Sequence, residues 1–292
     1  MFGTNEIIGK KYFKDAPKNS LFVTSMFFTL QGEGPFAGQP ALFIRLAKCN
    51  LDCSFCDTFF DDGDWMTFEQ IEDKMYDTII ANWEKPKDVP YWAINPKLAG
   101  KTHPGIVLVI TGGEPLLQEN LSEFMEDQLY MFRAVQVESN GIPDTVVPEG
   151  VTLVCSPKCM EKDGKAVKYY APSKTILDRA DCLKFVMSAD TESPYNNVPQ
   201  WAHDWKIKTG KDIYCSPMNI YNSFPQKIKL LRAEKGEITM AERSTVDEVI
   251  SWWEPGLLDM EKNEANHKYV GQYCMQHGFK MQMQIHLFAS LA

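Results

Sequence analysis

The stretch ALFIRLAKCNLDCSFCDT, residues 41–58, decides both the fold and the chemistry expected of this 292-residue chain. Its first part, Ala41–Leu46, is an apolar run typical of a buried strand. Its second part spaces Cys49, Cys53 and Cys56 as Cys-x3-Cys-x2-Cys. Thiolates hold iron–sulfur clusters, and three of them leave one iron of a 4Fe-4S cluster open to a ligand that is not protein. An open iron indicates a site for chemistry rather than for electron transfer alone.

Zinc and disulfide bonds are weaker interpretations of these three cysteines. A structural zinc ion has four protein ligands, and no further His or Cys follows the three at a short distance. An odd number of cysteines cannot pair completely, and nothing in the sequence indicates secretion. Cys155 and Cys159 have a similar spacing but no further close ligand, so we expect them to be small buried side chains.

Composition limits the class of protein. With 292 residues, 44% of them hydrophobic, the chain suits one large or two small domains. Its net charge of −9 disfavours non-specific binding to nucleic acid or to an anionic membrane. No apolar run approaches the roughly 18 residues of a membrane span. Eight cysteines and no visible export signal favour a reducing cytoplasm.

Apolar runs that alternate with helical patterns predict an α/β fold with a parallel sheet. The expected strands are a short one from Met26, then Ala41–Leu46, Ile106–Thr111, Ala134–Glu138, Val151–Cys155, Leu183–Met187 and Asp212–Cys215. About six such units are fewer than the eight of a closed barrel, so we expect a partial (β/α)6-type barrel. Helices are expected at 67–83, 117–132 and 246–253, the first with a Thr67–Gln70 capping box.

We expect one domain over residues 1–292, with its core at about 20–220. Residues 84–105 are rich in proline and are interpreted as an insertion. The charged stretch 190–270 is interpreted as a second insertion. The alternating pattern of residues 279–287 predicts a C-terminal strand.

The motif Thr111–Pro115, TGGEP, follows the apolar run IVLVI. Ligands collect at the carboxyl ends of parallel strands. Two glycines there permit close approach of the backbone to a ligand, and the Glu114 carboxylate can accept a hydrogen bond from an amine. By itself the motif is equally well explained as a turn.

The cysteine spacing together with the downstream Gly-Gly-Glu-Pro resembles the radical S-adenosylmethionine (SAM) superfamily. The segment Leu30–Thr58 is similar to the 7-carboxy-7-deazaguanine synthase family. Further similar blocks follow in order: TGGEPLL at 111–117, ESNG at 138–141, SPK at 156–158, SPMN at 216–219 and QIH at 284–286.

This resemblance implies a lyase of queuosine and 7-deazaguanine biosynthesis. Such an enzyme converts 6-carboxy-5,6,7,8-tetrahydropterin to 7-carboxy-7-deazaguanine with loss of ammonia. The reaction is implied to start with a 5′-deoxyadenosyl radical made from SAM, which is regenerated, and to be assisted by Mg²⁺. The cofactors carry the difficult chemistry, while the protein orients them and excludes water.

The resemblance also assigns roles by position. It implies cluster ligation by Cys49, Cys53 and Cys56, and a Mg²⁺ contact by Thr58. It implies SAM binding by Phe55, Cys56, Asp57, Gly113, Glu114, Glu138, Ser156, Pro157, Lys158, Ser216, Pro217, Met218 and Asn219. It implies substrate binding by Leu30, Gln31, Gly32, Arg45, Thr111 and Ala292, with Arg45, Glu33 and Thr111 as catalytic residues. Arg45 suits a substrate carboxylate because its guanidinium presents a fork of donors.

The implied partners are the pterin substrate, an external electron donor of the flavodoxin or ferredoxin type, and a second copy of the chain in a homodimer. Two other functions are compatible with the cysteine motif. One is an activase that places a glycyl radical on a partner protein, but such enzymes should lack the Gln-Gly-Glu-Gly block at 31–34. The other is a non-catalytic iron–sulfur interaction protein, which would have no need for Arg45, Thr58, Thr111 and Glu114 together.

Overall fold

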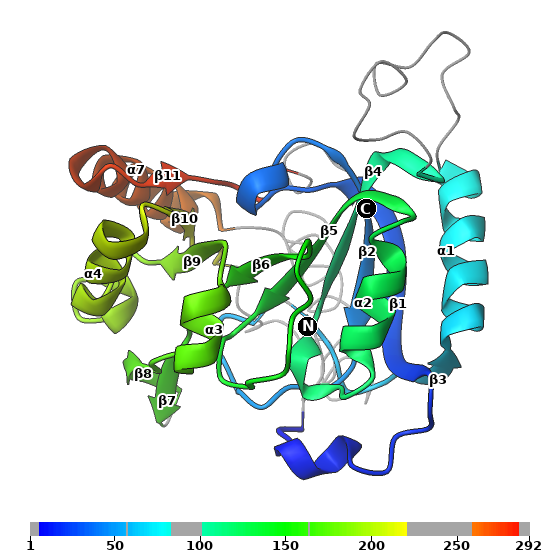
Figure 1. Ribbon diagram of the computed structural model, residues 1–292. Helices are drawn as coiled ribbons and strands as arrows, with labels where there is room; N and C mark the ends of the chain where they lie inside the picture. The colour runs from blue at the N-terminus through cyan, green and yellow to red at the C-terminus, as the bar shows by residue number, and fades with distance from the viewer. Residues whose placement is uncertain (1–5, 57, 83–100, 163, 221–258, 286–292) are drawn as a thin grey trace, which may run out of the picture.

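The computed structural model describes residues 6–56, 58–82, 101–162, 164–220 and 259–285 (Figure 1). A nine-stranded sheet organises this part of the chain, in the order β11-β10-β9-β6-β5-β4-β2-β1-β3. Asp57, Ala292, most of the proposed insertion at 84–105 and the expected helix at 246–253 lie outside the described residues.

The sheet is mostly parallel. Its strands are β1 (Ser20–Leu30), β2 (Pro40–Leu46), β3 (Asp64–Thr67), β4 (His103–Gly112), β5 (Phe132–Ser139), β6 (Thr152–Cys155), β9 (Cys182–Met187), β10 (Asp212–Pro217) and β11 (Lys280–Met281). All neighbours from β2 to β11 pair in parallel, whereas β1 is antiparallel to both β2 and β3. A separate antiparallel hairpin consists of β7 (Cys159–Lys162) and β8 (Lys165–Tyr169).

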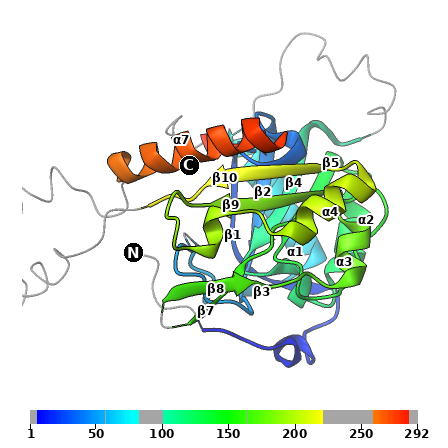
Figure 2. The ribbon, with the colours of Figure 1, turned by 90° about the vertical axis from the view of Figure 1, so that its left-hand side faces the viewer.

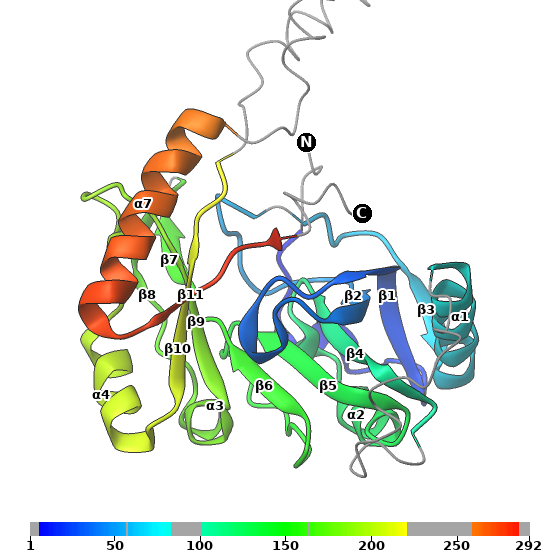
Figure 3. The same ribbon diagram turned by 90° about the horizontal axis from the view of Figure 1, so that it is seen from above.

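The helices lie along the outer side of the curved sheet (Figure 3). They are α1 (Phe68–Asn82), α2 (Leu121–Gln128), α3 (Lys174–Arg179), α4 (Gln200–Thr209) and α7 (Met260–His277). The loops contain the short 3-10 helices η1 (Lys10–Phe13), η2 (Gly34–Phe36), η5 (Pro115–Leu117) and η6 (Pro194–Asn196). Figure 2 shows α7 running along β10. The predicted capping box is present, because Thr67 Oγ1 accepts from the Gln70 amide and Gln70 Oε1 accepts from the Thr67 amide.

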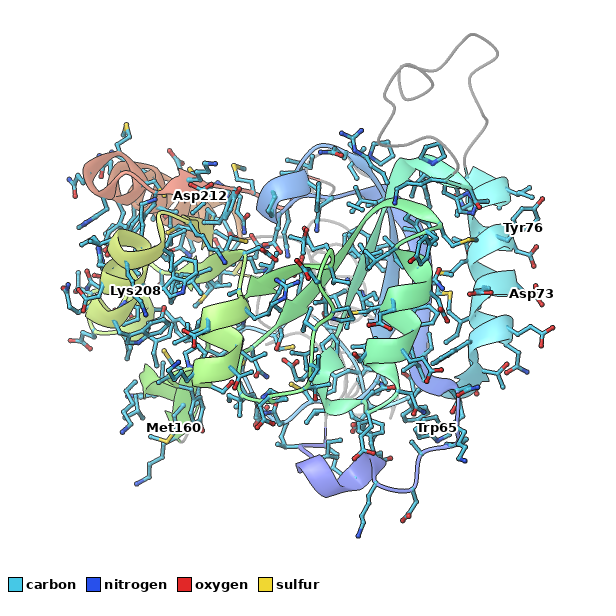
Figure 4. The ribbon with its side chains drawn as sticks, in the orientation of Figure 1. Trp65, Asp73, Tyr76, Met160, Lys208 and Asp212 are labelled. Atoms are coloured by element: carbon cyan, nitrogen blue, oxygen red, sulfur yellow. The ribbon has the colours of Figure 1, made fainter. Side chains whose placement is uncertain are left out.

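Side-chain alternation along the strands separates the core from the site. On one face, apolar side chains such as Ile44, Ile110 and Val137 pack against the helices in the main core. Each helix contributes one apolar stripe to this core; in α1 it is Ile71, Met75 and Ile79. The outer side of α1 is polar, and its labelled residues Asp73 and Tyr76 point away from the sheet (Figure 4). The opposite, inner face carries a smaller apolar cluster of Ala41, Phe43, Val107 and Val109, together with polar side chains such as Arg45 and Glu138.

The predicted α/β class with a parallel sheet is confirmed. Among the described strands the sheet is open, because its edge strands β11 and β3 do not pair with one another. The expected strand Asp212–Cys215 is present as β10, and α4 precedes it, so residues 200–217 belong to the sheet and its helical cover although they also fall within the range 190–270 that was interpreted as an insertion. The expected helix at 117–132 is shorter, since η5 and a loop precede α2.

The predicted C-terminal strand 279–287 was too long. Only Lys280–Met281 pairs with β10, and Gln282 then leaves the strand. The Gln282 side chain accepts from the Gly34 amide at 2.5 Å and donates to Ser216 Oγ at 2.8 Å. These two contacts draw the segment across the inner face of the sheet instead of along its edge.

Candidate active site

A cavity of about 220 Å³ lies on the inner face, around the carboxyl ends of the parallel strands. Residues singled out from the sequence that line it are Gln31, Glu33, Arg45, Cys53, Phe55, Cys56, Thr58, Thr111, Glu138, Ser156, Lys158, Ser216, Pro217 and Asn219. The fold thus brings together side chains that are scattered over most of the chain. Parallel sheets place their ligand sites at this end, because the strands finish there together.

Other residues singled out from the sequence do not line this cavity. They are Leu30, Gly32, Cys49, Gly113, Glu114, Pro157 and Met218. Met218 is buried beneath Phe55 in a small apolar cluster with Cys159 and Tyr195. Asp57 and Ala292 lie outside the described residues.

The three motif cysteines carry free thiols at one side of the cavity. Cys49 is buried, while Cys53 and Cys56 are half-buried and line the cavity wall. Burial raises the pKa of Cys49 and of Cys53 to about 12, so both thiols are protonated at neutral pH. Cluster binding must therefore release protons.

The donor set of this loop fits an iron–sulfur cluster, since thiol sulfur is the ligand that such clusters take. Within the part of the chain that the structure describes, no three His, Cys, Asp or Glu side chains already stand in a metal-holding geometry. Cys155 and Cys159, with the similar spacing, are both buried, as expected of structural cysteines.

Gly112 and Gly113 are required by the approach of the chain's own backbone. A Cβ on Gly112 would lie 2.1 Å from Leu46 O, and one on Gly113 would lie 2.0 Å from Lys48 O. The Gly113 amide donates to Leu46 O, and the Glu114 amide donates to Lys48 O. Both glycines admit the segment that leads into the cysteine loop, and Gly112 also lines the cavity.

Glu114 is a buried structural carboxylate in this arrangement. Its Oε1 accepts from Ser139 Oγ at 2.8 Å and from the Leu116 amide at 3.0 Å, and its Oε2 accepts from the Asn140 amide at 2.6 Å. Burial raises the pKa of Glu114 to about 7, although these hydrogen bonds by themselves would lower it. The side chain ties the TGGEP motif on β4 to the ESNG motif that ends β5.

Replacing Glu114 should therefore destabilise the protein even without any ligand. In Glu114→Ala the donors of Ser139, Leu116 and Asn140 lose their acceptor, which should lower the free energy of unfolding by about 3 kcal/mol. Urea denaturation of the metal-free protein measures this change. The control is Glu119→Ala, because Glu119 is a nearby glutamate that is exposed. Equal stability of the two variants would contradict the structural role of Glu114.

A buried ion-pair network crosses the cavity. Lys184 Nζ lies 2.5 Å from Glu33 Oε2 and 2.8 Å from Glu138 Oε2. Glu138 also accepts from the amides of Gln31 and Gln136. Burial would lower the pKa of Lys184, but the two carboxylates raise it above its ordinary value. Burial would likewise raise the pKa of Glu138, but Lys184 beside it lowers that pKa.

Arg45 stands at the end of β2 beside Thr111 on β4, its register partner. Its Nη1 donates to Thr58 Oγ1 at 2.9 Å, and its guanidinium lies over the Phe27 ring at 5.1 Å. The buried Nε has no hydrogen-bond partner. A buried donor without an acceptor is costly, so this nitrogen is a place for an acceptor on a ligand.

The segment after β11 packs on the loop between β1 and β2. Asn219 Nδ2 donates to Gln284 Oε1 at 2.7 Å. A Cβ on Gly32 would lie 2.9 Å from Gln284 Cα and 3.0 Å from Ile285 N. Gly32, expected from the sequence to bind substrate, therefore has a packing role that explains the absence of a side chain.

Comparison with known proteins identifies the family. A 7-carboxy-7-deazaguanine synthase of Rickettsia prowazekii is 33% identical over 242 residues, which cover 82% of this chain and 87% of that protein. The chain belongs to the 7-carboxy-7-deazaguanine synthase family. The protein of the same name from Rhodospirillum rubrum is 32% identical over 205 residues, covering 68% of this chain and 71% of the relative. No family model matches the chain.

The fold agrees with a solved structure. The crystal structure of QueE from Escherichia coli aligns with a TM-score of 0.52 at 19% identity, covering 94% of this chain and 97% of that one. At this identity the likeness concerns the fold. It confirms the mixed α/β architecture built on a large, mostly parallel sheet. Membership of the family implies a radical SAM enzyme with an iron–sulfur cluster.

Several cavity residues were missed from the sequence. They are Phe27, Phe43, Lys184 and Val186, whereas Gly112, Ser139, Asn140 and Gln284 lie in motifs that were noted without a separate role for these residues. Lys184 left a usable signal, because it is the one charged residue in the apolar run CLKFVM of a predicted strand. Side chains alternate between the two faces of a strand, so Lys184 lies on the same face as Cys182 and Val186. Leu183 and Phe185 lie on the other face, in the main core against the helices.

Proposed function

We propose that this protein converts 6-carboxy-5,6,7,8-tetrahydropterin to 7-carboxy-7-deazaguanine with loss of ammonia. One observation carries the proposal beyond family membership. A single cavity is lined by the cysteine loop, by the cations Arg45, Lys158 and Lys184, and by the carboxylates Glu33 and Glu138. An anionic substrate and a zwitterionic cofactor would both find complementary charges there.

Cys49, Cys53 and Cys56 would hold a 4Fe-4S cluster. When bound, the cluster and SAM supply the radical that starts the reaction. Lys158, whose Nζ donates to Ser156 O and Oγ, stands in the wall expected to bind SAM. Ser216, Pro217 and Asn219 extend the same wall from the end of β10. The protein's task in this step is to orient the cofactor and to exclude water.

The substrate would lie between the β1–β2 loop and the end of β2. Glu33 and Gln31 offer acceptors to the N–H groups of the pterin. Arg45 offers its guanidinium fork, including the unpartnered Nε, to the substrate carboxylate. Thr111, beside Arg45 in register, limits the space at this end.

Arg45→Ala should weaken binding of the pterin by about 10- to 100-fold, because a charge-assisted hydrogen bond contributes about 1.5–3 kcal/mol. The dissociation constant is measured by anaerobic calorimetry, and the cluster absorption spectrum should stay as in the wild type. Lys168→Ala, an exposed cation on β8, serves as the control. Wild-type affinity in Arg45→Ala would show that the carboxylate lies elsewhere.

We infer that Thr58 contributes one oxygen to Mg²⁺, which binds few protein ligands and keeps water or substrate oxygens. Thr58 Oγ1 accepts from Arg45 in this structure. Binding of Mg²⁺ by Thr58 would remove the acceptor of Arg45, and the substrate carboxylate would replace that acceptor. Mg²⁺ and the substrate would therefore bind together. The flavodoxin- or ferredoxin-type electron donor, the homodimer and the cytoplasmic location stay predictions.

No helix of the described residues has the length and apolar character needed to span a membrane.

The proposed reaction is tested by anaerobic incubation of the reconstituted protein with SAM, Mg²⁺, a reductant and the pterin. Mass spectrometry should find a product lighter than the substrate by one ammonia. SAM cleavage without this product would favour the activase, and a cluster without SAM cleavage would favour the interaction protein.

A further inference from the structure

Lys184 joins the two carboxylates that the proposed function assigns to different ligands. Glu33 belongs to the loop expected at the pterin, and Glu138 lies near the end of β5, the strand expected at SAM. The Lys184 ammonium contacts both, at 2.5 and 2.8 Å, and its side chain is only 8% exposed. Glu33 and Lys184 are 151 residues apart in the chain, so the fold alone creates this pairing.

The hydrogen bonds leave different acceptor capacities on the two carboxylates. An ionised carboxylate offers about four lone-pair sites. Glu138 accepts from Gln31, Gln136 and Lys184. Within the part of the chain that the structure describes, Glu33 accepts from Ser216 Oγ on one oxygen and from Lys184 on the other. Glu33 therefore keeps one free site on each oxygen, which suits two neighbouring N–H donors.

The charged groups around Lys184 come from several elements. Glu33 precedes η2, and Glu138 is the last residue but one of β5. Lys158 follows β6 as a second cation, whose pKa is lowered by burial and by Lys184. On β9 itself the neighbouring titratable group is the buried thiol of Cys182, whose pKa burial raises to about 12. Ser216 and Gln282, which face the network from β10 and the C-terminal segment, are neutral.

We propose that Lys184 is a positioning residue for substrate recognition. It pairs with the Glu33 carboxylate and holds it directed into the cavity, as a double acceptor for the adjacent N–H groups of the pterin ring. Through its second contact it fixes this orientation to Glu138. The inference rests on the proposed function, because it takes the ligand of Glu33 to be the pterin.

Lys184→Met tests the role of the charge. Without the ammonium, two carboxylates share a buried space and become easier to protonate. The affinity for 6-carboxy-5,6,7,8-tetrahydropterin near pH 7 should fall about tenfold or more, and should recover about tenfold per pH unit toward higher pH. Anaerobic calorimetry on the cluster- and SAM-loaded protein gives the dissociation constant. The wild type should lack this slope.

Two further variants separate charge from shape. Lys184→Arg keeps the cation and should keep the flat pH profile. The double variant Lys184→Met/Glu138→Gln removes one charge of each sign and should regain much of the neutral-pH affinity. Lys280→Met is the matched control, because Lys280 pairs with Asp212 at 2.7 Å on the same sheet but is exposed. Its affinity and pH profile should equal those of the wild type.

Three results would overturn the inference. An unchanged affinity and an unchanged pH profile in Lys184→Met would remove Lys184 from substrate recognition. A loss of affinity that is equal at every pH, accompanied by a lower Tm, would reduce Lys184 to a structural role. If Lys184→Met fails to fold, Lys184→Arg takes its place in the test. A pterin affinity that changes with pH in Lys184→Arg would then contradict the positioning role of Lys184. Absence of pterin binding by the wild type would instead refute the proposed function.

Discussion

Cys53→Ala is expected to leave no detectable cleavage of SAM. Cys53 lines the cavity from the middle of the cysteine loop, and two remaining thiols cannot replace the ligand of one iron. The variant should lack the absorption of the cluster and bind less iron per chain. Iron content, the absorption spectrum and the amount of 5′-deoxyadenosine formed under reducing conditions are the measurements.

A second cysteine variant controls for the loss of any thiol. Cys274 is also a free cysteine, but it is buried in α7 within the main core. Cys274→Ala should keep the cluster and the cleavage of SAM. If Cys53→Ala retained a full cluster and cleaved SAM, the assignment of the cysteine loop would be wrong.

Gly113→Ala is expected to disrupt the site although Gly113 does not line the cavity. The added Cβ would lie 2.0 Å from Lys48 O, so the backbone that enters the cysteine loop must move. We expect a loss of stability of about 3 kcal/mol or more, together with poor loading of the cluster. Thermal unfolding of the metal-free protein and iron content after reconstitution are measured in parallel.

The matched control is another glycine that has room for a methyl group. At Gly271 in α7 the added Cβ would meet only Met281 Sδ, at 3.6 Å, an ordinary contact. Gly271→Ala should therefore fold and load iron as the wild type does. Normal stability and normal iron content in Gly113→Ala would contradict the packing role given to this glycine.

Much of the sheet could be predicted because its strands are short apolar runs separated by polar segments. The strands around Ile44, Ile110, Val137 and Phe185 were each expected close to their observed bounds. The start of β1 at Ser20 was missed, since this strand was expected only from Met26. The β7–β8 hairpin was missed because its strands, CMEK and KAVKY, contain charged residues and no apolar run.

The candidate site was harder to predict than the strands. Motif residues could be assigned to one cavity, because the carboxyl ends of parallel strands meet. What each motif contacts depends on strand order, which the sequence did not show. Glu114 therefore faces Ser139 and Asn140 on the neighbouring strand end, and Lys184 meets Glu33 from a distant loop.

The central claim is tested most directly by the ratio of product formed to SAM consumed in one anaerobic reaction. The protein carries its reconstituted cluster and receives the pterin, Mg²⁺ and a reductant. We expect 7-carboxy-7-deazaguanine in clear excess over 5′-deoxyadenosine, because SAM is regenerated in each turnover. Formation of 5′-deoxyadenosine without 7-carboxy-7-deazaguanine would contradict the account.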